Sequence, residues 1–87
     1  MRGLLGRREL PPGEGILLRP AGSIHTFFMR FSIDAVFLNA DGVVLSIATG
    51  VRPWRVAVCK RARSVLELPA GESERRGLEV GEKLVAT

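Results

Sequence analysis

Several residue types that carry chemistry are scarce in this sequence of 87 residues, which has one cysteine, one histidine, one tryptophan and no tyrosine. A single cysteine excludes an internal disulfide framework and fits a reducing compartment. The sequence has none of the closely spaced His and Cys pairs of metal sites and no glycine-rich phosphate loop. We therefore expect no metal and no cofactor.

Long hydrophobic runs are also missing. No apolar segment approaches the ~20 residues that a membrane-spanning helix needs. The stretch from Met1 to Arg8 carries charge but lacks the apolar centre of a signal peptide. The sequence therefore predicts a cytoplasmic protein with no membrane partner.

Positive charge is concentrated in the first part of the chain. Residues 1–63 include ten basic and four acidic residues, a net charge of +6, whereas residues 64–87 include three basic and five acidic residues, a net charge of −2. Eleven of the thirteen cations are arginine, whose planar guanidinium group suits phosphate and carboxylate. The pattern permits an anion-binding face, although basic side chains along a strand edge also prevent sheets from pairing.

Glycine and proline divide the sequence into short apolar pieces, a spacing typical of mainly β domains. We predict a mainly β, compact, sandwich-like or barrel-like single domain over residues 1–87. One short helix is expected at residues 71–76, because acidic residues open this segment, basic residues close it and Gly77 follows. Strands outside the central hairpin are expected at residues 15–19, 55–59, 65–68 and 83–85, while residues 25–31 fit either an irregular segment or a helical turn.

The strongest local signal is that central β-hairpin. Residues 33–40 and 43–50 flank Asp41-Gly42, a dipeptide favoured in two-residue type I′ turns. Both faces of the hairpin are then largely apolar, which predicts a central pair of strands covered on both sides. The facing pairs expected from this turn are Ala40/Val43, Leu38/Leu45, Val36/Ile47 and Asp34/Thr49.

Asp34 is the most informative polar position. In this hairpin register its carboxylate shares a face with Val36 and points toward the core, where it must be paired or hydrogen-bonded. His25 and Arg30 are close enough in the sequence to supply a partner. The cluster is either a structural network at the entry to the hairpin or a small polar pocket. No nucleophile elbow is present, so an enzyme is the least favoured interpretation.

A second candidate site is a basic segment around the single tryptophan. An indole between two guanidinium groups can stack a nucleic-acid base. Alternatively, Trp54 folds under as a loop plug that arginine side chains cover. The residues of this candidate anion or nucleic-acid site are Arg52, Trp54, Arg55, Lys60, Arg61 and Arg63.

Two segments of the sequence stand in a characteristic order. The first is His25-Thr-Phe-Phe-Met29 followed by Asp34, and the second is Leu66-Glu-Leu-Pro-Ala-Gly71. With them, the sequence from Arg2 to Val85 resembles the DUF192 family. The resemblance implies a compact mainly β domain of bacteria and archaea without an established biochemical activity. Many relatives carry a further strand, and often an export signal, ahead of the segment that matches residues 2–7. Either an edge strand is missing here or the start of the sequence has been placed late. The family motif falls on His25, Thr26, Met29, Asp34, Glu67, Pro69 and Gly71.

The leading functional hypothesis is a non-enzymatic binding or accessory domain. Its pocket would accept a small polar ligand or a peptide. The alternative is binding of nucleic acid or another anion through residues 52–63. Both a monomer and a homodimer are compatible with the sequence, since an unpaired edge on a small β domain favours pairing. The expected pocket residues are His25, Thr26, Met29 and Asp34, with Glu67 and Pro69 near the rim.

Overall fold

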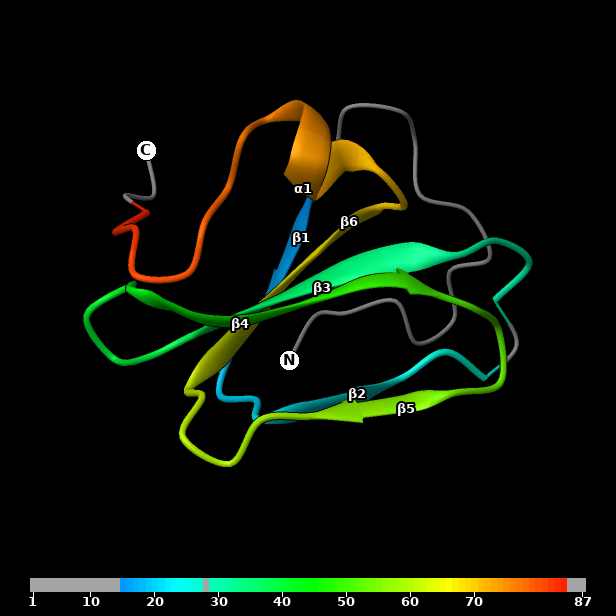
Figure 1. The fold of residues 1–87 in the computed structure, drawn as a ribbon. Helices are drawn as coiled ribbons and strands as arrows, with labels where there is room; N and C mark the ends of the chain where they lie inside the picture. The colour runs from blue at the N-terminus through cyan, green and yellow to red at the C-terminus, as the bar shows by residue number, and fades with distance from the viewer. Residues whose placement is uncertain (1–14, 28, 85–87) are drawn as a thin grey trace.

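The computed structural model describes residues 15–27 and 29–84. These residues form two antiparallel sheets and one short helix, which confirms the mainly β prediction (Figure 1). The larger sheet has the strand order β1-β6-β3-β4, and β2 pairs with β5 in a two-stranded sheet. Within the described ranges, no helix has the length and apolar composition that a membrane crossing requires. The elements are β1 (Ile16–Leu18), β2 (Ser23–His25), β3 (Ile33–Leu38), β4 (Val44–Val51), β5 (Val56–Val58), β6 (Ser64–Pro69) and α1 (Glu72–Arg75).

The central strand is β3, whose six residues are all buried. Ile33, Ala35 and Phe37 alternate along one face and pack in a cluster with Ile24 of β2. The intervening Val36 packs on the other face with leucines from the segment after α1. The β2–β5 sheet therefore covers one face of the large sheet, while α1 and residues 77–84 lie on the opposite face (Figure 1). β3 is covered on both sides as expected, but β4 lies at an edge.

The turn between β3 and β4 differs from the expected two-residue turn. The Asn39 N–H donates to the Val43 carbonyl at 3.0 Å, and the Gly42 N–H donates to the Asn39 carbonyl at 3.0 Å. The loop therefore comprises residues 40–42, with Gly42 in the left-handed conformation (φ 82°), which is the usual three-residue hairpin loop. The Asn39 side chain favours this longer loop because its Oδ1 accepts the N–H groups of Asp41 and Val43, each at 2.9 Å.

A β-bulge next to this turn restores most of the expected register. Leu38 pairs with Val44 rather than with Leu45, which corrects the prediction at that position. The extra residue in β4 then brings Val36 opposite Ile47, as expected.

A second irregularity in β4 lies opposite Asp34. The register changes between Ile33 and Ala35 of β3, and Gly50 of β4 adopts a φ of 59°. A glycine in this conformation is typical of one class of β-bulge. The expected pair of Asp34 with Thr49 is therefore replaced by a bulge that turns the Gly50 N–H toward Asp34.

The remaining elements match the sequence pattern in place but not always in length. Strand β2 was not among the predicted strands, and its last residue, His25, begins the segment that fitted either an irregular structure or a helical turn. Lys83 forms only an isolated bridge with Val43 rather than a strand, and Val85 lies outside the described residues. Helix α1 ends at Arg75, before Gly77 as expected. The N–H groups of Gly77 and Leu78 return to the carbonyls of Glu74 and Ser73 in a Schellman motif.

Two glycines with positive φ provide a test of the turn geometry. We expect Gly77→Ala to lower the free energy of unfolding by about 1 kcal/mol. The cost comes from placing alanine in the left-handed conformation, since a Cβ at this position meets no other atom within 4 Å. Gly42→Ala should cost roughly twice as much or more, since the new Cβ also lies 2.7 Å from the Leu84 carbonyl oxygen. Urea unfolding of both variants measures the difference. Equal losses would contradict the close approach of residue 84 to the hairpin loop.

Candidate functional site

Asp34 is completely buried on β3 and is saturated with hydrogen bonds. Its Oδ1 accepts the Gly50 N–H at 2.9 Å. Its Oδ2 accepts the N–H of Gly71 at 3.1 Å, and the N–H and hydroxyl of Ser73 at 3.0 and 2.6 Å. Burial raises the pKa of this carboxyl, but the hydrogen bonds outweigh burial and lower the pKa below its ordinary value. Asp34 is therefore an ionised clamp that joins β3 to the bulge of β4 and to the start of α1.

The partners of Asp34 are not those that the sequence suggested. Neither His25 nor Arg30 is among its hydrogen-bond donors, which are backbone N–H groups and one serine hydroxyl. Asp34 lies on the same face of β3 as Val36, on the side of α1, whereas β2 with His25 lies against the opposite face. The structure therefore does not bring Asp34 and His25 into one pocket.

Glu67 of β6 is a second buried carboxyl, and its environment is very different. It is 2% exposed, and its Oε1 has no hydrogen-bond partner among the described residues. Glu67 pairs with Ile16 and Ala35 and so shares their face, the one covered by the β2–β5 sheet. Burial raises the pKa of Glu67 to about 7. Met29 packs into the same core cluster, and Pro69 lies two residues further along the strand.

Thr26 organises the loop between β4 and β5. Its buried hydroxyl donates to the Arg52 carbonyl at 2.7 Å and accepts the Arg55 N–H at 2.8 Å. Its backbone adds a bond to the Arg55 carbonyl at 2.9 Å and accepts the Trp54 N–H at 3.0 Å. These contacts hold Trp54 at a φ of 63°, a conformation uncommon for residues other than glycine and concentrated at functional sites.

Three aromatic side chains form a row beside the outer side of the β2–β5 sheet. The ring centroids of His25 and Phe27 are 4.8 Å apart, and those of Phe27 and Trp54 are 5.4 Å apart with the planes inclined by 26°. Trp54 is 56% exposed, so it is not the buried plug of the alternative interpretation. We refer to this row and the two neighbouring exposed valines as the ring face, which consists of His25, Phe27, Trp54, Val56 and Val58.

The two valines and Phe27 were missed as surface residues by the sequence analysis. Val56 and Val58 are about 60% exposed, whereas Ala57 between them faces the core. The alternation of β5 therefore places its large apolar residues outward and its small one inward. Among the described residues, four of the five large hydrophobic side chains that are exposed belong to the ring face. Contiguous exposed apolar surface of this kind marks interaction sites.

Basic side chains accompany the ring face. Arg52 and Arg55 lie on either side of Trp54 in the loop before β5, and Lys60 and Arg61 follow β5, all of them exposed. The sequence between Asp41 and Glu67 contains no acidic residue. Arg63, the last residue of the basic segment, lines a cavity on the other face of the large sheet.

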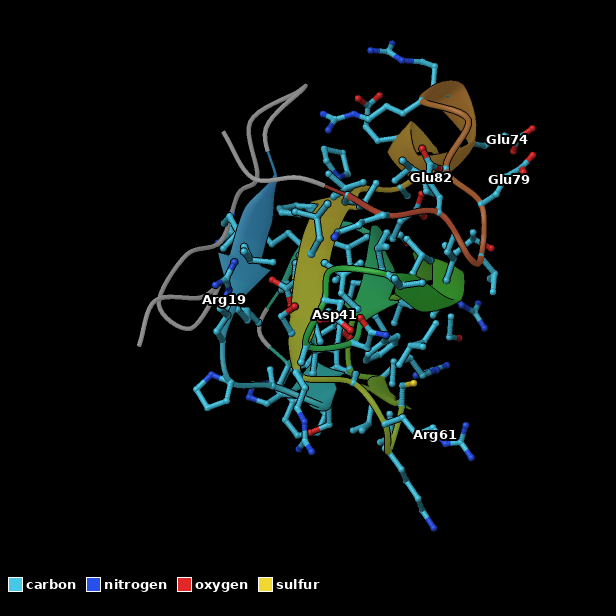
Figure 2. The ribbon with its side chains drawn as sticks, turned by 90° about the vertical axis from the view of Figure 1, so that its left-hand side faces the viewer. Arg19, Asp41, Arg61, Glu74, Glu79 and Glu82 are labelled. Atoms are coloured by element: carbon cyan, nitrogen blue, oxygen red, sulfur yellow. The ribbon has the colours of Figure 1, made fainter. Side chains whose placement is uncertain are left out.

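Three exposed glutamates lie near α1. Figure 2 shows Glu74, Glu79 and Glu82 close to α1, whereas Arg61 lies at the opposite end of the view. Cations are present there too, since Arg75 and Arg76 pair with Glu72 of α1. Within residues 15–27 and 29–84, no three His, Cys, Asp or Glu side chains gather as metal ligands would.

The family model of DUF192, described as an uncharacterized ACR, matches residues 1–86. The chain belongs to the DUF192 family. UPF0127 proteins of Pyrococcus abyssi and Pyrococcus furiosus are each 43% identical to it over 63 residues, a match that covers 71% of this chain and 53% of each relative. The match therefore spans about half the length of these relatives.

Two solved structures resemble this DUF192 domain. A protein of unknown function from Novosphingobium aromaticivorans has a TM-score of 0.79 at 26% identity, covering 93% of this chain and 63% of its own. A candidate transcription regulator from Sinorhizobium meliloti has a TM-score of 0.80 at 25% identity, covering 93% of this chain and 68% of its own. These similarities support the fold, and the DUF192 family supplies no activity for it.

The clamp role of Asp34 predicts a large loss of stability in the variant Asp34→Asn. The amide would present N–H groups to donors that now meet a carboxylate oxygen, so we expect the free energy of unfolding at pH 7 to fall by roughly 3 kcal/mol. The carboxylate contributes this stability above its ordinary pKa, and the contribution disappears as the pH falls through the lowered pKa. The difference between wild type and variant should therefore shrink in acid. Urea unfolding at several pH values tests this, and a constant difference would contradict an ionised clamp.

For Glu67 we expect the contribution to stability to depend on pH in the opposite sense to that of Asp34. Its raised pKa means that folding loses stability as the pH rises from the ordinary value of 4.5 through about 7. Between pH 4.5 and 8, the stability of Glu67→Gln should improve relative to wild type by about 3 kcal/mol. Unfolding curves at the two pH values measure the change, with Glu79→Gln as an exposed control. Parallel profiles for wild type and Glu67→Gln would contradict the raised pKa.

Proposed function

We propose that this DUF192 domain binds single-stranded nucleic acid across the ring face. The observation that carries the proposal is the row of His25, Phe27 and Trp54, with the exposed Arg52 and Arg55 close to Trp54 in the same loop. Each base stacked on an aromatic side chain contributes about 1–3 kcal/mol with little dependence on sequence. Guanidinium and ammonium groups beside such a row neutralise the phosphates that connect the bases.

The loop that carries Trp54 supports the proposal because it is ordered by the protein itself. Thr26 bonds to Arg52, Trp54 and Arg55 through both its hydroxyl and its backbone. An aromatic ring that is already held in place loses less conformational freedom on binding than a mobile one. Thr26 is completely buried and therefore acts as a positioning residue for the ring face. Of the expected pocket residues, His25 belongs to the ring face, while Asp34 belongs to the scaffold.

The distribution of charge also favours a polyanionic partner. Arg52, Arg55, Lys60 and Arg61 precede and follow β5 and are exposed. No acidic residue occurs in the sequence between Asp41 and Glu67. A local excess of positive charge attracts an anionic strand. The name of the Sinorhizobium relative, a candidate transcription regulator, is in keeping with a nucleic-acid partner. Stacking on exposed rings favours unpaired bases, since bases in a duplex are already stacked.

A salt-dependent titration tests this function. We expect an oligothymidylate of about ten nucleotides to shift the backbone amides of residues 25–27 and 52–58 in NMR spectra. With about three phosphate contacts, the affinity should fall roughly twentyfold between 50 and 200 mM salt. Absence of saturable shifts at the lower salt concentration would overturn the proposal.

Matched variants separate stacking from net charge. Trp54→Ala should weaken binding about tenfold or more, and Thr26→Val should weaken it while leaving the cation count unchanged. The double variant Arg52→Gln/Arg55→Gln should lower both the affinity and its dependence on salt. Arg75→Gln/Lys83→Gln removes the same charge outside the ring face and should have little effect. Equal losses in the two double variants would indicate nonspecific attraction and contradict a site on the ring face.

A further inference from the structure

A cavity lies on the face of the large sheet opposite to the ring face. Its volume is about 550 Å³, within the roughly 300–1,000 Å³ typical of small-molecule sites. Leu17 of β1, Leu66 of β6 and Leu38 of β3 form its floor, and Leu84 adds an apolar wall. The ring face does not contribute to this cavity, so the inference drawn from it is independent of the proposed function.

The charged side chains among the described residues that line this cavity are all arginines. Arg19 follows β1, Arg63 precedes β6 and Arg76 follows α1, so three arginines from distant parts of the sequence meet at one cavity. No acidic residue is among the described residues that line it. Asn39 also lines it, and because its Oδ1 already accepts two backbone N–H groups, its amide nitrogen remains to donate.

Arg19 and Arg63 stand at the same end of the β1–β6 pair, because Leu18 is paired with Val65. Figure 2 shows Arg19 beside β1. The ion pairs among the described residues involve Arg75 and Arg76, both with Glu72, and leave Arg19 and Arg63 without a carboxylate. Arg76 is anchored by Glu72 at 3.3 Å and so forms a fixed part of the wall.

We propose that this cavity binds a small amphipathic carboxylate. The apolar body lies on Leu17, Leu38 and Leu66, and the carboxylate accepts hydrogen bonds from Arg19 and Arg63. Guanidinium groups suit this head group because they present parallel N–H donors to its two oxygens. A neutral molecule of the same shape would bury apolar surface equally well but would leave the two guanidinium groups without an acceptor.

The experiment uses three probes on the whole chain: sodium decanoate, decanol and acetate. Decanoate, kept below its micelle concentration, should produce saturable amide shifts at residues 15–19, 38–42, 63–66 and 84. Decanol should bind at least about tenfold more weakly, corresponding to the loss of one charge-assisted pair. Acetate should give no shifts there, because it lacks the apolar body. Equal affinity for decanoate and decanol, or shifts outside these segments, would overturn the proposal.

Variants identify the residues that select the acid. Arg19→Gln/Arg63→Gln should lower the affinity for decanoate about tenfold or more and leave that for decanol unchanged. Arg52→Gln/Arg61→Gln removes the same charge from the other side of the molecule and should leave decanoate binding intact. Both pairs alter exposed side chains, so folding should be retained, which thermal unfolding verifies. A loss of decanoate binding that is the same in both double variants would contradict a site in the cavity.

Discussion

The carboxylate of Asp34 joins three parts of the chain that are far apart in the sequence. Its two oxygens receive N–H groups from Gly50 in β4 and from Gly71 and Ser73 at the start of α1. The clamp holds the bulge of the edge strand and the position of the helix over the large sheet at the same time. A fully buried charge is tolerated here because every bond of the clamp is directed at the ionised form.

The large sheet that contains Asp34 has two faces, and each face carries one candidate binding site. On the side of Asp34, α1 and residues 77–84 lie over the sheet and leave a leucine-floored cavity bordered by arginines. On the other side, the β2–β5 sheet packs on Ile33, Ala35 and Phe37 and presents His25 and two valines outward. A second network of hydrogen bonds, around Thr26, orients the loop that contains Trp54. Asp34 thus positions the elements on the cavity side of the sheet, and Thr26 positions the loop of the ring face.

Much of the fold could be predicted because its signals are local. The breaks at glycine and proline located β1, β5 and β6 to within a few residues, and the charge pattern with Gly77 located α1. The predicted hairpin turn was wrong because the Asn39 side chain accepts two backbone N–H groups. These bonds favour a longer loop than the two residues Asp41-Gly42. Val36 still faces Ile47 because a bulge compensates for that extra loop residue.

The sequence by itself determined that the domain is mainly β, that Asp34 points into the core and that arginine dominates the cations. These follow from the alternation of side chains along a strand and from composition. Only the tertiary structure decided which partners each polar side chain meets. His25 and Asp34 are nine residues apart in the sequence but lie on opposite faces of the large sheet, whereas His25 and Trp54 come from separate segments and share the ring face. The reason is physical: contacts across sheets depend on which face each strand buries, and that choice is made by the packing of the whole chain.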